Sequence, residues 1–227
     1  MNHVTIAAAA TLPVLLAACA PEVESTLYLA DILAVAETGE PIVAPALLRV
    51  PQAGEDECRQ NIAGLVERLA GLAPVSGRSR CISKDQHGQG TQLAEIETEL
   101  LIVPAGATAP APNLFVVEVA TTDSGAADLT LSMLEPVGTV IDRLQAQNPA
   151  QVDFDPSFFF VVLNNDTPGP VVLSVNHVFV DDRSSLDVDG TIPLARRETA
   201  TIRFSDVASA HVEQGRSYWF ATVAPAE

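Results

Sequence analysis

The sequence has few basic residues and few aromatic ones. Lys and Arg account for 12 of its 227 residues and Asp and Glu for 29, so the formal net charge is −17. Lys84 is the only lysine. Nucleic acids bind to cationic surfaces and stack on aromatic rings, and only 5% of this chain is aromatic, so we exclude nucleic acid as a partner. The 48% of hydrophobic residues is enough to bury a core, which excludes a disordered acidic tail.

The sequence also lacks an apolar run long enough to cross a membrane. Its longest apolar segment, residues 6–18, is interrupted only by Thr11 and Pro13. A spanning helix needs about 20 apolar residues, whereas this length is typical of the apolar region of a secretory signal peptide. The segment ends in Leu16-Ala17-Ala18-Cys19. The other interpretation is a buried core helix that ends at an ordinary cysteine.

Residues 16–19 match the lipobox of bacterial lipoproteins at every position, and the sequence resembles that class. The resemblance implies that residues 1–18 are a signal peptide and that Cys19 becomes the first residue, carrying a diacylglyceryl thioether and an N-acyl chain. Ala20 stands where lipoproteins kept at the inner membrane have Asp, which implies the outer membrane. Residues 19–25 would form a lipidated tether. Residues 19–33 also loosely resemble uncharacterised small lipoproteins of bacteria and their tailed phages, which brings no known activity.

Three cysteines are present, and lipidation of Cys19 leaves Cys58 and Cys81. An exported chain enters an oxidising compartment, so we expect these two to form a disulfide. The alternative is a pair of metal ligands, but the close spacing and the histidine partners of such sites are missing.

The first part of the chain, residues 26–104, reads as an α+β domain. Residues 31–36 predict a short helix that ends at Thr38-Gly39, and the acidic residues 55–57 predict the first turn of an amphipathic helix that carries Cys58. Cys81 would lie on the strand that follows, so the bridge would pin helix to sheet. Further strands are expected at residues 22–29, 42–50 and 93–103. We expect the second of these to be an edge strand because it is flanked by Pro41 and contains Pro45.

Residues 105–112 contain only Ala, Pro, Gly and Thr and predict a linker, followed by a β-rich domain over residues 113–227. One short helix is expected at residues 137–144, and everything after it reads as all-β. The run at 158–163 is apolar on both faces, as in a central strand. Strands at this spacing favour an immunoglobulin-like sandwich. The other expected strands lie at residues 114–120, 129–134, 171–180, 199–204 and 217–223.

No catalytic signature stands out. The sequence has no G-x-S-x-G elbow and no H-E-x-x-H pair, and we nominate no catalytic residue. His177 falls in an alternating strand, where a half-exposed position is the simplest interpretation. The best candidate for a site is an acidic turn that could offer oxygen ligands to Ca²⁺, with a solvated turn as the alternative. Its residues are Asp181, Asp182, Asp187 and Asp189.

Two functions follow as expectations. The first is an envelope lipoprotein, bound to the bilayer through acylated Cys19, that acts as a non-enzymatic binding or assembly module for a protein partner and is of phage or prophage origin. The second is an envelope hydrolase that uses carboxylates in a cleft. A cleft with opposed carboxylates would distinguish them.

Overall fold

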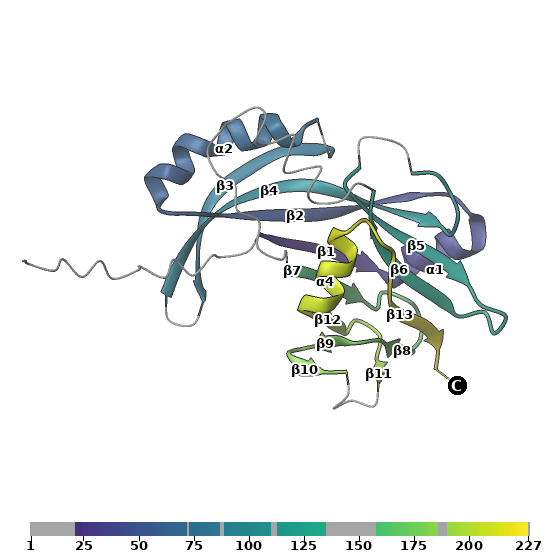
Figure 1. Ribbon diagram of the computed structural model, residues 1–227. Coiled ribbons are helices and arrows are strands. Elements are labelled where there is room, and N and C mark those ends of the chain that lie inside the picture. Colours follow the sequence, from purple (N-terminus) through teal and green to yellow (C-terminus); the bar gives the residue numbers. More distant parts are fainter. Residues whose placement is uncertain are drawn as a thin grey trace, which may run out of the picture.

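A computed structural model describes residues 21–71, 73–86, 89–109, 113–134, 158–185 and 190–226. In this part of the chain, thirteen strands form one mixed sheet and three helices lie against it (Figure 1). No helix within the described ranges is both long and apolar enough to span a membrane. The helices are α1 (Leu29–Thr38), α2 (Glu55–Leu69) and α4 (Asp206–Glu213). The strands are β1 (Glu22–Tyr28), β2 (Ile42–Gln52), β3 (Val75–Gln86), β4 (Gln89–Pro104), β5 (Phe115–Thr121), β6 (Ala127–Met133), β7 (Phe158–Asn164), β8 (Val171–Val175), β9 (Val178–Val180), β10 (Arg183–Ser184), β11 (Thr191–Leu194), β12 (Thr199–Phe204) and β13 (Tyr218–Pro225).

The strands follow the order β10-β9-β12-β7-β1-β2-β4-β5-β6-β13-β8-β11, and β3 pairs with β4 beside this path. Two pairs are parallel, β1 with β7 and β4 with β5; the others are antiparallel. The expected α+β class is confirmed. The immunoglobulin-like arrangement is not confirmed, because the strands of the described residues pair in one curled sheet.

The core joins the parts of the chain that lie before and after residues 105–112. One buried cluster contains Ile96 of β4, Phe115 of β5 and Phe159 of β7, and the rings of Phe115 and Phe159 meet edge to face at 5.4 Å. The parallel pairs β1–β7 and β4–β5 also connect the two parts. The described residues therefore share one core across the predicted linker. Residues 22–25, assigned to the tether from the sequence, form the start of β1.

Both predicted helices of the first part are present. α1 ends at Gly39, whose φ of 72° is the left-handed conformation that terminates helices, and its N–H donates to Val35 O. α2 begins with Glu55, Asp56 and Glu57, which stabilise the positive end of its dipole. The predicted helix at residues 137–144 lies outside the described residues.

Three expectations about the strands are wrong. β2 is a central strand between β1 and β4, although it contains Pro45. Its ladder with β1 ends at the Ser25–Ala46 pair, next to Pro45, so the missing N–H of the proline interrupts no further β1–β2 pair. The segment 171–180 forms two strands, because His177 has a φ of 49° and breaks the ladder. The last part of the chain also contains a helix, α4.

Candidate functional site

The face of the sheet opposite the core carries a row of alternating charges. Glu22 on β1 lies opposite Arg49 on β2, Arg49 lies opposite Glu95 on β4, and Glu95 lies opposite Arg80 on β3. Directly opposed residues on one face are close enough to interact, so the register alone places opposite charges side by side on four strands. These residues, with Glu24 and Lys84, form what we call the ion-pair network.

Arg49 is the centre of the network. Its Nε–H donates to Glu95 Oε2 at 2.9 Å, and Nη1 donates to Glu24 Oε2 at 2.8 Å and lies 3.5 Å from Glu22 Oε2. Only 11% of the Arg49 side chain is exposed, and 5% of that of Glu22 and Glu95. Buried charges are stable only when they are paired, and this network supplies the pairing.

Two lateral cations complete the network. Arg80 donates to Glu95 Oε1 through Nε at 2.7 Å and forms an ion pair through Nη2 at 2.6 Å, with most of its side chain exposed. Lys84 on β3 donates to Glu22 Oε2 at 2.8 Å and lies 5.8 Å from the ring centre of Phe160 on β7. Since β2 and β4 separate β3 from β1 in the sheet order, this contact shows how strongly the sheet curls here.

The network changes the protonation behaviour of its central pair. Burial works against the charge on Arg49, but its hydrogen bonds to Glu24 and Glu95 raise its pKa above the usual value. Burial also works against the charge on Glu95, yet the hydrogen bonds from Arg49 and Arg80 lower the pKa of this carboxyl below its usual value. Both residues are therefore held in their charged forms.

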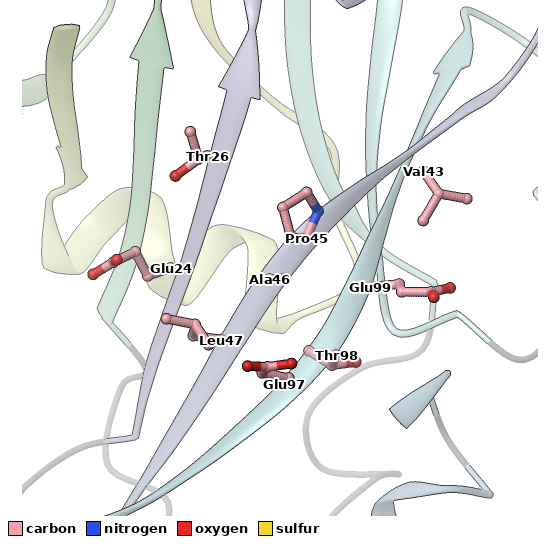
Figure 2. Close-up of a pocket in the computed structure, with 9 residues that line it drawn as sticks. All are labelled: Glu24, Thr26, Val43, Pro45, Ala46, Leu47, Glu97, Thr98 and Glu99. Atoms are coloured by element: carbon pink, nitrogen blue, oxygen red, sulfur yellow. The ribbon is translucent and has the colours of Figure 1, made fainter. Parts of the chain in front are cut away.

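A groove of about 470 Å³ lies beside the network on the same region of the sheet (Figure 2). It lies where the ladder between β1 and β2 ends, and Ser25 Oγ donates there to Pro45 O at 2.9 Å. Apolar side chains of β2 are exposed in the groove, including Val43, of which 54% is exposed. Its lining residues are Glu24, Thr26, Val43, Pro45, Ala46, Leu47, Glu97, Thr98 and Glu99.

The groove is acidic and open. Glu97 and Glu99 come from β4, directly opposite Leu47 and Pro45 of β2. Glu24 comes from β1 and is paired with Arg49, which connects the groove to the ion-pair network. Exposed apolar side chains beside carboxylates suit a ligand that is apolar and positively charged.

The predicted disulfide is present. Cys58, in the first turn of α2, is bonded to Cys81 of β3, with their Cα atoms 6.0 Å apart. Cys58 is fully buried. The bridge pins α2 to the sheet, as the sequence predicted, and the alternative of a metal pair is wrong.

The expected calcium turn is only partly within the described residues. Asp187 and Asp189 lie outside them. Asp181 and Asp182 are exposed, have φ angles of 46° and 64°, and Asp181 Oδ1 accepts a hydrogen bond from the Thr201 N–H. Among the residues that the structure describes, no group of three or more His, Cys, Asp or Glu side chains could hold a metal ion. Cys19 also lies outside the described part.

Sequence reasoning missed the ion-pair network and the groove. The only local signal is the alternation of acids at Glu22 and Glu24 and at Glu95, Glu97 and Glu99, which places each set on one face of a strand. Which cations face these acids depends on the register of strands far apart in the chain.

Together these features define an α+β domain with a single curled sheet, a buried ion-pair network and an acidic groove. Residues 21–227 match a family described as a domain of unknown function, DUF7424, and the chain belongs to this family. No curated protein and no solved structure matches the chain.

Proposed function

We propose that this protein is an envelope lipoprotein, anchored in the outer membrane through acylated Cys19, that binds a protein partner through the groove without catalysing a reaction. The lipobox at residues 16–19 is the observation that carries the anchor. The Cys58–Cys81 disulfide supports it, because such bonds persist in oxidising compartments outside the cytosol.

The groove supports the binding role. Carboxylates of Glu97 and Glu99 lie beside the exposed side chains of Val43 and Pro45, so a segment with both apolar and basic residues would bury apolar surface and gain charge complementarity. The alternative, a hydrolase, would use these same carboxylates. We favour binding because Glu97 and Glu99 lie two residues apart on one strand, β4, and the carboxylate of the other wall, Glu24, is paired with Arg49 at 2.8 Å.

The anchor is tested by mass spectrometry of the purified protein. We expect an N-terminal peptide that begins at Cys19 with the mass of its acyl chains, and a Cys19→Ser variant that keeps residues 1–18 and gains no lipid. A wild-type protein of uncleaved length without lipid would refute the anchor.

The groove is tested by a photo-crosslinking amino acid placed in the envelope-located protein. At position 43 we expect a specific adduct with one protein partner, which Glu97→Gln with Glu99→Gln weakens. The matched control is position 207, because Val207 on α4 is also an exposed valine but lies outside the groove. Equal adducts from both positions, or none from position 43, would refute the groove as the binding site.

A further inference from the structure

The start of β1 fixes where a lipid anchor would hold the domain. Only three residue steps separate Cys19 from Glu22, so their Cα atoms are at most about 10 Å apart. Glu22 is not a free end: it pairs with Arg49 of β2 on one side and with Phe158 of β7 on the other. A short tether attached to this fixed point would keep the start of β1 close to the membrane.

Two exposed cations of the ion-pair network, Lys84 and Arg80, have unused donors. Lys84 Nζ lies 2.8 Å from Glu22 Oε2, and 41% of its side chain is exposed. An ammonium group has three donors, so its bond to Glu22 leaves others for a second acceptor. Arg80 uses Nε and Nη2 on Glu95 while 72% of its side chain is exposed. Both groups can therefore bind a phosphate without breaking the network.

The charge balance of this region differs from that of the whole chain. The network contains three carboxylates, on Glu22, Glu24 and Glu95, and three cations, on Arg49, Arg80 and Lys84. The chain as a whole carries −17. Because the network itself is neutral and has spare cationic donors, an anionic lipid surface repels it less than it repels the acidic groove beside it or the chain as a whole.

We infer that Lys84 and Arg80 contact the phosphates of the lipid headgroups, so that the start of β1 faces the membrane and the opposite end of the sheet points away. This inference rests on the proposed lipid anchor at Cys19. Headgroups occupy about 5 to 7 Å on each side of the hydrocarbon core. A lysine beside Glu22 is therefore within reach of them.

The far end of the sheet supplies the control. β1 and β4 are both antiparallel to β2, and β5 is parallel to β4, so β5 runs in the same direction as β1. The turn after β5, with exposed Asp123, therefore lies at the end of the sheet opposite Glu22 (Figure 1). Asp123→Lys places a second amine there.

The experiment uses the lipidated protein in vesicles of phosphatidylethanolamine and phosphatidylglycerol. A short bifunctional reagent that reacts with amines is added, and peptide mass spectrometry measures two products at each lysine. In the first product the reagent joins the lysine to phosphatidylethanolamine, and in the second it is attached to the lysine alone. The result is the ratio of the first product to the second. This ratio corrects for the different reactivity of the two amines. Lys84 is the only lysine of the native chain, so the adduct is assigned without ambiguity.

We expect a ratio at Lys84 many times that at position 123 of Asp123→Lys. Equal ratios, or a higher ratio at position 123, in a protein whose acyl mass is present would overturn the orientation and leave the proposed anchor intact. Absence of the acyl mass would instead refute the anchor, and the inference with it.

Discussion

Arg49 and Glu95 lie directly opposite each other on β2 and β4, and the Arg49 Nε–H donates to Glu95 Oε2 at 2.9 Å on the face of the sheet away from the main core. This pair joins Glu22 and Glu24 of β1 to Arg80 of β3. It thereby links four strands through side chains as well as through backbone hydrogen bonds.

Removing the central cation is expected to destabilise the fold strongly. Arg49→Met keeps much of the side-chain volume but leaves Glu22 and Glu95 buried without their shared partner. Breaking a buried ion pair from one side costs about 3–5 kcal/mol. Urea unfolding measures this change in the free energy of unfolding.

The matched control is Arg59→Met on α2. Arg59 forms an ion pair with Glu55 one turn away, but about two thirds of its side chain is exposed. Exposed pairs contribute about 0–1 kcal/mol, so this variant should unfold close to the wild type. Similar losses for both variants would contradict a central role for Arg49.

The stability should depend on pH through Glu95. Its pKa is lowered in the folded state, so its carboxylate stabilises the fold above the unfolded value of about 4.3, and this contribution is lost as pH falls through the folded pKa. The free energy of unfolding of the wild type should exceed that of Glu95→Gln most near neutral pH. The difference should shrink below about pH 4. A difference that stays constant in acid would refute this assignment.

The control is Glu40→Gln, because Glu40 is exposed. Its free energy of unfolding should differ little from that of the wild type at any pH.

Local patterns predicted the elements whose causes are local. The acids at residues 55–57 and Gly39 marked helix boundaries correctly, and the apolar run of β7 identified a central strand. α4 was missed although Ser205 Oγ caps it by accepting from the Ala208 N–H, because eight residues give too short a periodicity to recognise.

Features that depend on distant pairing were not predictable in this way. Pro45 indicates an edge strand if the strand is considered alone, and only the end of the β1–β2 ladder next to it explains why it is tolerated in β2. In the same way, nothing near Arg49 in the sequence identifies Glu22 or Glu95 as its partners, since these lie 27 and 46 residues away.

A buried asparagine is expected to stabilise the turn after β7. Asn165 is fully buried; its Nδ2 donates to Gly169 O and Leu194 O, and its Oδ1 accepts from Thr167 N–H and Oγ1. Asn165→Ala leaves several of these groups without partners, at a cost of about 1–3 kcal/mol. The control is Asn176→Ala, whose side chain donates one long bond of 3.4 Å to Trp219 O. Thermal unfolding that ranked the two variants equally would contradict this role.

The disulfide is expected to hold the start of α2 in place. The buried residues of this helix are Cys58 and Leu69, which lie near its two ends, so apolar packing fixes the far end and the bridge to Cys81 fixes the near end. Replacing both cysteines with alanine should cost about 3 kcal/mol by the chain-entropy argument for a loop of this length. The loss should be local: hydrogen exchange should speed up first in the amides of residues 58–66, while β4 stays protected.

The wild type treated with a reductant should reproduce this pattern, because reduction removes the same constraint without changing the sequence. If reduction left the exchange of α2 unchanged, packing alone would hold the helix, and the bridge would contribute nothing to docking it on the sheet.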